Sequence, residues 1–303
     1  MRVLVTGASG LIGSQLCDAL LARGDQVVGL SRDPDRARET NPTLSWHAWR
    51  PTAERPPAAA LEGVAGVVNL VGEPIDRRWT DDAKRRILES RERATKNLVD
   101  ALSATDPRPS VLVSQSAAGY YGDRGDALVD ESTPAGESFD AGICVSWEAA
   151  AHGAEQLGVR VAVTRTGLVL DSKEGLLKQL LLPFKLGLGG PIASGRQYMP
   201  WIHIADEVRM LQWTLDTESA SGTYNATSPN PVTNREFSKT LGQVLGRPAV
   251  LSVPKVALRL RFGEELTETL AGGQRALPRR ALDAGFEFSH PELEPALRDL
   301  LKR

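Results

Sequence analysis

Cysteine is scarce in this chain of 303 residues, which contains only Cys17 and Cys144. Two cysteines so far apart form no disulfide framework and match no metal-ligand spacing. Histidine is also rare, and His47, His152 and His290 form no recognisable cluster in the sequence. We therefore expect no metal site, and a reducing, cytoplasmic environment.

An excess of charge of one sign is also absent. The 36 lysines and arginines nearly balance the 38 aspartates and glutamates, which leaves a net charge of −2. This balance gives no electrostatic reason to expect nucleic acid or an anionic membrane as a partner. No segment reaches the roughly twenty uninterrupted apolar residues that span a bilayer, and no secretory leader pattern is recognisable. We expect the partner to be a small molecule. We expect the protein itself to be a monomer or a homodimer.

Short apolar runs alternate with segments of helical period through the first half of the chain. The runs are nearly continuous in valine, leucine and alanine, as expected for parallel strands with helices on both faces. This alternation predicts an α/β fold with a doubly wound parallel sheet of the Rossmann type. The predicted strands are Arg2–Thr6, Gln26–Leu30, Val64–Leu70, Val111–Ser114 and Val159–Arg165; the predicted helices are Leu11–Ala22, Thr80–Ser103 and Ile143–Gln156.

The pattern loosens after about residue 170, where the glycine-rich segment Gly187–Gly195 and the turn-rich segment Gly222–Val232 interrupt it. Two later helices are predicted at Thr233–Leu245 and Leu293–Lys302. The expected domains are a dinucleotide-binding domain at residues 1–170, with returns to the sheet near 200–230, and a smaller mixed substrate lobe at 171–303 whose C-terminal module covers about 250–300.

Three glycines follow the first predicted strand at intervals of three residues: Gly7, Gly10 and Gly13. The first allows a tight turn, the second lets the backbone approach a pyrophosphate, and the third lets helix and strand pack closely. A helix N-terminus beside this turn adds free N–H groups to the anion site. Between a strand and a helix, this triplet is the dinucleotide-binding fingerprint. The predicted cofactor-binding residues here are Gly7, Ser9, Gly10, Leu11, Ile12 and Gly13.

The end of the second predicted strand indicates which dinucleotide is bound. A ribose-binding acid usually stands at this tip, but the sequence there reads Ser31 and Arg32. A hydroxyl followed by a guanidinium suits a 2′-phosphate, which favours NADP. In the alternative interpretation Asp33 binds the ribose of NAD, and Arg32 is a solvated surface charge.

These residues resemble the extended short-chain dehydrogenase/reductase superfamily, and most of all its atypical branch of nucleoside-diphosphate-sugar epimerases with a small C-terminal module. The specific segments are Asn69–Ile75, Ser116–Asp123, Cys144–Glu148, Arg165–Leu170 and Trp201–Asp206, followed by Leu277–Arg280, Ala284–Phe288 and His290–Leu293. The resemblance covers essentially the whole chain and implies further cofactor contacts. These are Asn69, Leu70, Val71, Gly72, Ser114, Trp147, Arg165 and Gly167.

The superfamily's catalytic Tyr-x-x-x-Lys motif is missing. No tyrosine of this chain has a lysine four positions later. By resemblance Ser116 is the catalytic serine, and Tyr120 or Tyr121 is a candidate for the missing phenol. Without a lysine, a tyrosine keeps a pKa near 10 unless another charge lowers it. A standard dehydrogenase or 4-epimerase mechanism is therefore not expected.

The helix that should carry the motif allows two registers. One pairs Ile143 with Trp147, so that Trp147 fills the lysine's space and stacks near a nicotinamide or substrate ring. The other pairs Cys144 with Glu148 on one helix face. A thiol–carboxylate proton relay is then possible, but we expect a packed Cys144 and a solvent-directed Glu148, because a negative neighbour discourages the thiolate.

Four residues are predicted to line the substrate cleft: Glu73, Arg91, Trp201 and His203. Arg91 would meet a phosphate or carboxylate, although solvated helix arginines are common. His203 and Asp206 resemble the superfamily segment that closes the cleft, although His203 also fits a satisfied structural histidine. Two functions remain open: an NADP-dependent oxidoreductase or epimerase acting on a small polar substrate such as a sugar nucleotide, and a non-catalytic NADP(H)-binding regulator or sensor.

Overall fold

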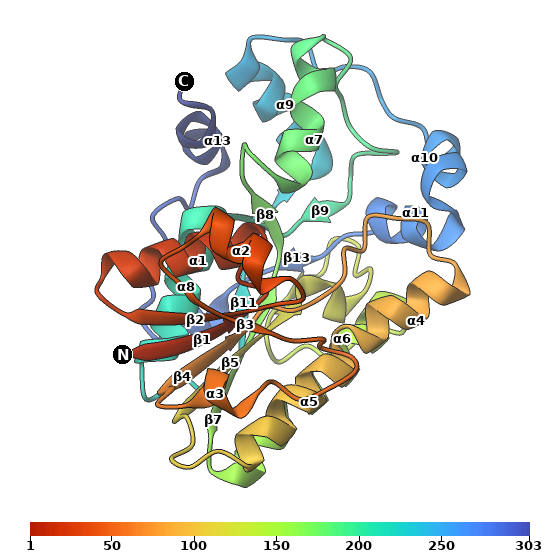
Figure 1. Ribbon diagram of the computed structural model, residues 1–303. Helices are drawn as coiled ribbons and strands as arrows, with labels where there is room; N and C mark the ends of the chain where they lie inside the picture. The colour runs from red at the N-terminus through yellow and green to blue at the C-terminus, as the bar shows by residue number, and fades with distance from the viewer.

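The computed structural model describes residues 1–303, and seven parallel strands form its central sheet. Their order is β11-β7-β5-β4-β1-β2-β3 (Figure 1). The chain therefore adds β2 and β3 on one side of β1, and then β4, β5, β7 and β11 on the other side. The doubly wound parallel sheet predicted from the alternation of strands and helices is confirmed. The strands are β1 Arg2–Thr6, β2 Gln26–Ser31, β3 Ser45–Ala48, β4 Gly66–Asn69, β5 Val111–Ala117, β7 Arg160–Thr166 and β11 Gly222–Ala226.

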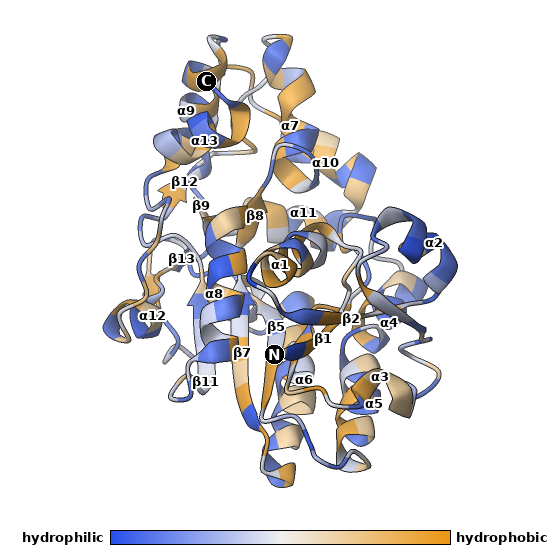
Figure 2. Ribbon diagram, turned by 60° about the vertical axis from the view of Figure 1, so that its left-hand side comes forward, coloured by the Kyte–Doolittle hydropathy of each residue, from blue (hydrophilic) through white to orange (hydrophobic).

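Helices cover both faces of this sheet. On one face, α1 and α8 pack on the strands around Val5, Val113 and Leu211. On the other face, α5, α6 and the short α3 enclose Leu4, Leu98 and Leu112. Figure 2 shows the apolar central strands between these helices. The helices are α1 Leu11–Ala22, α2 Pro34–Thr40, α3 Ala58–Leu61, α5 Glu92–Ser103, α6 Phe139–His152 and α8 Ile204–Asp216, with 3₁₀ turns at Ala118–Tyr121 and Gly153–Leu157.

The single helix predicted over Thr80–Ser103 is wrong, because the chain breaks there into α4 (Asp81–Glu89) and α5. Ser90 lies between them, and its hydroxyl donates back to the Ile87 carbonyl and accepts the N–H of Glu73. Arg91 then caps α5 at its N-terminus. No glycine or proline marks the break, so the helical period runs through it unnoticed.

The C-terminal lobe has a core of its own, built from α7, α9 and α13 around the buried Trp201. The two late helices predicted from the sequence are confirmed to within a residue at each start: α9 is Asn234–Leu245 and α13 is Leu293–Leu301. Thr233 and Glu236 form a reciprocal capping box at the start of α9. α7 covers Gly175–Lys185.

Short elements join the lobe to the sheet. Three two-stranded pairings form outside the main sheet, β8 with β10, β9 with β12, and β6 with β13. No helix has the length and apolar character needed to cross a membrane. The remaining elements are β6 Leu128–Val129, β8 Leu168–Leu170, β9 Tyr198–Met199, β10 Trp201–His203, β12 Val232–Thr233, β13 Arg275–Ala276, α10 Lys255–Phe262, α11 Glu264–Ala271 and α12 Arg279–Asp283.

Candidate functional site

The turn between β1 and α1 has the geometry of an anion cradle. Gly7 has a φ of +66°, and a β-carbon on Gly13 would lie 2.1 Å from the Gly7 carbonyl oxygen. Only glycine therefore allows α1 to start this close to the strand. No side chain caps the helix at Gly10, so the first-turn N–H groups remain available to a bound anion. These features fit the pyrophosphate of a dinucleotide.

The contacts at the tip of β2 bear on the two predicted alternatives, a 2′-phosphate bound by Ser31 and Arg32 or a ribose bound by Asp33. The Asp33 carboxylate accepts the N–H of Arg36 at 3.1 Å and so caps α2. The Ser31 hydroxyl folds over the same turn, 3.0 Å from the Asp33 carbonyl oxygen. Arg32 is exposed and forms no ion pair. Because Asp33 already caps α2, Arg32 is the residue left free at this tip, and its guanidinium suits a 2′-phosphate.

Asn69, predicted to contact a cofactor, is buried in a network of side chains. Its Oδ1 accepts from the Thr6 hydroxyl at 2.8 Å, and its Nδ2 donates to Thr95 and Ser114. The Thr6 oxygen in turn accepts the N–H groups of residues 70 and 71. The side chains of Asn69 and Ser114 therefore fix the backbone beyond β4, and the chain that they fix, Leu70–Gly72, lies directly beside Gly7.

Gly72, Arg91 and Trp147 come together although they lie far apart in the sequence. A β-carbon on Gly72 would lie 3.0 Å from Cζ of Arg91, whose guanidinium lies 5.2 Å from the centre of the Trp147 ring. Arg91 has no ion-pair partner, and burial lowers its pKa. The Trp147 indole N–H is buried without an acceptor. Arg91 donates to the Ile87 carbonyl at 3.2 Å, so the Trp147 indole is the donor here without an acceptor. The Glu73 carboxylate turns toward Arg77 at 3.4 Å.

A buried ion pair stands at the carboxyl ends of β5 and β7. The Ser116 hydroxyl donates to Oε1 of Glu148 at 2.7 Å. Arg165 binds the same carboxylate in a bidentate geometry: Nε donates to Oε1 at 2.9 Å, and Nη2 donates to Oε2 at 2.8 Å. Burial alone would lower the pKa of Arg165, but the hydrogen bonds and charge of Glu148 outweigh burial and raise it. Ser116 is thus held by a buried ion pair joined by two hydrogen bonds.

The expectation of a solvent-directed Glu148 is wrong, because this side chain is only 8% exposed and makes the bonds just described. The register that pairs Cys144 with Glu148 brings both residues beside Ser116 and Ala117. Burial, followed by the charge of Glu148, raises the pKa of the Cys144 thiol to about 12. The prediction of a packed Cys144 is confirmed, and the thiol stays protonated at neutral pH.

Tyr121 is buried completely, and its hydroxyl donates to Oδ1 of Asn225 at 2.7 Å and accepts from Arg165 at 3.1 Å. Burial raises its pKa to about 12 in spite of Arg165. The phenol is therefore engaged by two side chains within the core, and its role as an acid/base stays a prediction. Tyr120 lies half-buried under the guanidinium of Arg165, 3.3 Å from the ring centre. The Tyr120 ring therefore contacts the Arg165 guanidinium through a cation–π interaction.

Two residues predicted to line the cleft lie in the core instead. Trp201 is fully buried in the lobe and donates its indole N–H to the Asn230 carbonyl at 3.2 Å. His203 is also buried, and its Nδ1 accepts the N–H of Ala205 as the cap of α8. One nitrogen of His203 thus serves the backbone, which favours the alternative interpretation of a structural histidine. Both predictions failed because a motif in sequence does not show which way its side chains turn.

His290, placed in no cluster from the sequence, stacks on His203 with ring centres 3.8 Å apart, and Asp299 lies 3.2 Å from His203 Nε2. The three residues do not fit a metal site. Because Nδ1 of His203 already accepts a hydrogen bond, the neutral ring carries its proton on Nε2, where a metal would need a lone pair. Asp206 accepts the N–H groups of Ser289 and His290, so this cluster fastens residues 289–290 to α8.

Glu207 is an ionisable group with few partners. It is fully buried beneath β7, and its one partner is the Thr166 hydroxyl at 2.9 Å, which in turn accepts from Gln115. The other carboxylate oxygen has no partner. Burial raises the pKa of Glu207 to about 8.

This raised pKa predicts a stability that falls with pH. The folded protein holds a proton on Glu207 that the unfolded chain has released above its ordinary pKa of 4.5, so stability is lost as pH rises toward 8. Glu207→Gln removes the ionisation. We expect the wild type to lose up to about 2 kcal/mol of unfolding free energy relative to this variant between pH 6 and pH 8. Urea unfolding of both proteins across this range measures the difference; parallel curves would contradict it.

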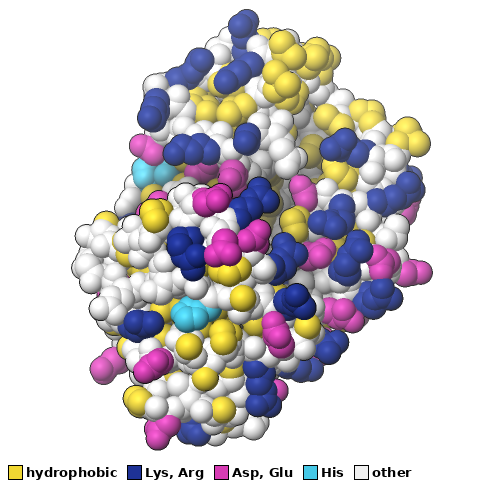
Figure 3. Space-filling model, viewed as in Figure 1, with side chains coloured by type: hydrophobic (Ala, Val, Ile, Leu, Met, Phe, Trp, Pro, Cys, Tyr) yellow, Lys and Arg dark blue, Asp and Glu magenta, His cyan; other side chains and the backbone are white.

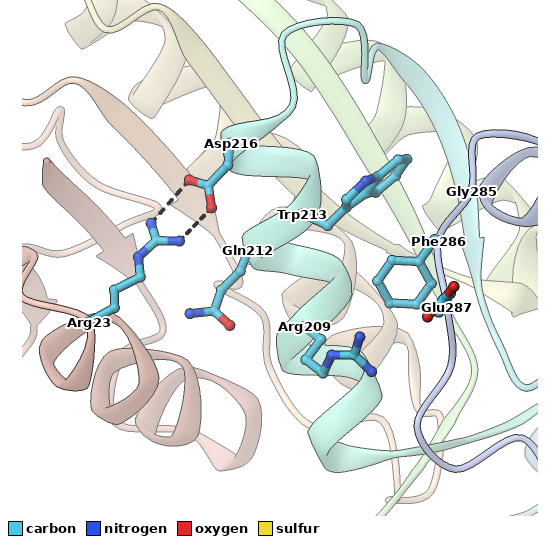
Figure 4. Close-up of a pocket in the computed structure, with 8 residues that line it drawn as sticks. All are labelled: Arg23, Arg209, Gln212, Trp213, Asp216, Gly285, Phe286 and Glu287. Atoms are coloured by element: carbon cyan, nitrogen blue, oxygen red, sulfur yellow. Dashed lines mark hydrogen bonds and ion pairs between the residues drawn. The ribbon is translucent and has the colours of Figure 1, made fainter.

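Two hollows lie away from the glycine turn. One, of about 460 Å³, is at the opposite edge of the sheet, where α1 and α8 end (Figure 4). There Arg23 pairs with Asp216, and Trp213 faces Phe286. The other, of about 380 Å³, lies between the start of α6 and α11 and has an acidic lining that includes Asp140 and Glu268. The second hollow lies on the same side as Ser116, since Asp140 is close to Gly119.

Comparison with known proteins gives two family matches in one chain. Residues 3–227 match the NAD dependent epimerase/dehydratase family. Residues 253–300 match a domain of unknown function, DUF1731. The epimerase family protein MT2273 of Mycobacterium tuberculosis is 42% identical over 296 residues, which cover 97% of this chain and 96% of the relative.

Solved structures agree with these matches. The human epimerase family protein SDR39U1, crystallised with NADPH, superposes with a TM-score of 0.89 at 35% identity, covering all of both chains. A nucleoside-diphosphate sugar epimerase from Corynebacterium glutamicum gives a TM-score of 0.81 at 29% identity, covering 99% of this chain and 58% of that one. The family resemblance drawn from the sequence motifs is confirmed.

Proposed function

Because this chain belongs to the NAD-dependent epimerase/dehydratase family, we propose that it is an NADP(H)-dependent oxidoreductase or epimerase acting on a small polar substrate such as a sugar nucleotide. One observation carries the proposal: the hydroxyl of Ser116 is oriented by the buried Glu148–Arg165 pair at the edge of the sheet that the glycine turn shares. Burying an ion pair costs desolvation free energy. Such a pair is therefore expected where it holds a functional side chain in a fixed orientation.

The residues present fit NADP(H). Gly7, Gly10 and Gly13 with the start of α1 would receive the pyrophosphate, and Ser31 with Arg32 the 2′-phosphate. The Trp147 indole N–H, which is buried without an acceptor, would donate to an oxygen of the cofactor or substrate. When bound, the nicotinamide supplies the hydride acceptor or donor. The NADPH bound by the human relative supports this choice of cofactor.

The chain's own chemistry at the site centres on Ser116. Its proton points to Glu148, so the oxygen keeps lone pairs to accept a hydrogen bond from a substrate hydroxyl. Arg165 fixes the Glu148 side chain through two hydrogen bonds, which makes Glu148 a positioning residue for Ser116. Arg91, uncompensated beside Trp147, would attract an anionic part of the substrate. Residues 171–303 would then form the substrate side of the site.

A second function, a non-catalytic NADP(H)-binding regulator, is favoured by one specific observation. Ser116 is only 2% exposed, and its donor capacity is already used by Glu148. Burial also raises the pKa of the Cys144 thiol and the Tyr121 phenol to about 12, so neither is tuned for proton transfer at neutral pH. In such a protein the cofactor would shift an equilibrium between two conformations by binding one of them better.

Arg32→Ala tests the cofactor assignment. Removing a charge-assisted contact to the 2′-phosphate is expected to weaken NADPH binding by roughly tenfold to a hundredfold and to leave NADH binding unchanged. Calorimetric titration of the purified protein with both nucleotides measures the two affinities. Arg38→Ala, which removes an exposed arginine of α2 paired with Asp35, is the matched control. Equal losses for NADPH and NADH would count against the 2′-phosphate role.

Turnover distinguishes the two functions. NADPH oxidation and substrate epimerisation are followed by absorbance and by NMR over a panel of carbonyl compounds and sugar nucleotides. For the enzyme, Ser116→Ala is expected to lower kcat/KM by roughly a hundredfold or more with unchanged NADPH affinity. Ser132→Ala, at an exposed turn, is the control. Tight NADPH binding without conversion of any compound would favour the regulator.

A further inference from the structure

The outer tip of the C-terminal lobe exposes aliphatic side chains. Leu182 is 67% exposed and Val250 is 74% exposed, whereas the apolar core of the lobe is buried. We call this surface the apex. It consists of Leu182 at the end of α7, the turn residues Leu186 and Leu188, and Val250 and Leu251 between α9 and α10.

The apex residues form one continuous surface although they come from two segments. The N–H groups of Leu186 and Leu188 bond to the carbonyls of Leu182 and Pro183, which folds the turn back onto α7. The N–H of Leu251 donates to the Gly189 carbonyl at 3.3 Å and links the second segment to this turn. Beyond it, α10 exposes Val256 and Leu260, one helical turn apart.

The charge of these segments is strongly one-sided. Residues 175–196 and 237–263 contain no aspartate or glutamate. Lys185 and Arg247 directly flank the apex, and neither has an ion-pair partner in the structure. Figure 3 shows yellow and dark blue side chains at the top of the molecule and no magenta ones. Lys255 and Arg259 of α10 pair with Glu264 and Glu268 of α11. The other basic residues of the two segments are Lys178, Lys185, Arg196, Lys239, Arg247 and Arg261.

The charge and residue types of the apex indicate which kind of partner it fits: a second copy of the chain, another protein or a membrane. A second copy of the chain placed on its twofold axis would bring basic residues against basic residues, with no acid in either segment to pair them. Protein-binding hot spots favour tryptophan, tyrosine and arginine and are poor in lysine and leucine, whereas the apex has leucine, valine and lysine. Protruding aliphatic residues ringed by basic ones are the pattern of interfacial membrane binding.

We propose that the apex is a docking surface for an anionic lipid bilayer. Its leucines and valines enter the boundary between headgroups and acyl chains, while Lys185 and Arg247 contact anionic headgroups. No membrane-spanning helix is required for this mode of binding. The near-neutral total charge, from which no anionic membrane was expected, conceals the local excess because acidic residues collect elsewhere in the chain.

Vesicle co-sedimentation of the full chain tests the proposal. We expect binding to vesicles of equal parts phosphatidylcholine and phosphatidylglycerol, little binding to pure phosphatidylcholine, and loss of most binding at about 0.5 M salt, where charges are screened within a few ångströms. Lys185→Glu with Arg247→Glu is expected to weaken binding by at least about tenfold. Leu186→Ser with Leu188→Ser is expected to weaken it comparably by removing the inserted side chains.

Matched variants separate the apex from general effects. Arg93→Glu with Arg108→Glu changes the net charge equally on the far side of the sheet, and Leu128→Ser removes another exposed leucine; both should bind vesicles as the wild type does. Unchanged NADPH affinity and melting temperature confirm that all variants fold. The proposal is overturned if the wild type does not sediment with anionic vesicles, or if the controls lose as much binding. It is also overturned if the leucine variant converts a dimer into monomers, because the apex is then a subunit interface.

Discussion

Glu148→Ala is expected to lower the free energy of unfolding by about 3–5 kcal/mol. The substitution leaves the Arg165 guanidinium buried without its carboxylate and removes the acceptor of the Ser116 hydroxyl. An uncompensated buried charge costs far more than the pair contributes, since its desolvation is no longer offset. Urea unfolding followed by circular dichroism at neutral pH measures the loss.

Two further variants show whether the loss comes from the unpaired charge. Glu148→Leu combined with Arg165→Met replaces both partners by apolar side chains and should recover most of the stability. Glu92→Ala breaks an exposed pair with Lys96 on α5 and should change stability by less than about 1 kcal/mol. A loss below about 1 kcal/mol for Glu148→Ala itself would show that Arg165 finds water or another partner, and would refute the role given to the pair.

Gly13→Ala is expected to weaken NADPH binding at least about a hundredfold. The new β-carbon would lie 2.1 Å from the Gly7 carbonyl oxygen and 2.9 Å from Cα of Ala8, which are backbone atoms that cannot rotate away. α1 must therefore move off β1, and its N-terminal N–H groups leave the position that the pyrophosphate needs. Fluorescence titration with NADPH measures the affinity, and thermal melting reports the accompanying loss of stability.

Gly142→Ala is the matched control for this substitution. Gly142 lies within α6 with no atom within 4 Å of the added β-carbon, so alanine should stabilise the helix by about 0.5–1 kcal/mol. NADPH binding that survives Gly13→Ala with unchanged affinity would mean that the cofactor does not sit at this turn.

The sheet could be predicted because its signal is local. Runs such as Val3–Val5 and Val111–Val113 are apolar on both faces, and the glycine turn follows the first strand directly. The strand β3 (Ser45–Ala48) escaped prediction because an edge strand of four residues carries little apolar pattern. The break at Ser90 escaped because it depends on a hydrogen bond to Glu73, a residue seventeen positions away.

The centre of the candidate site could not be predicted from local pattern. A glutamate on a helix is most often solvated, and only the tertiary fold brings Arg165 from β7 and Ser116 from β5 to Glu148. His290 and His203, 87 positions apart, meet in the same way. Such contacts leave no trace in spacing or composition.

The positions of the lobe's core residues along the chain determine when that core can form during synthesis. Its buried residues begin at Leu170 and Leu177 and include Leu293 and Leu297 of α13. When a ribosome has completed the parallel sheet with β11, the apolar faces of α7 and Trp201 still lack the helices α9 and α13 that cover them. At roughly 5–20 residues per second, α13 follows β11 by several seconds. Throughout that interval the apolar residues of α7 lack the helices that cover them in the folded protein.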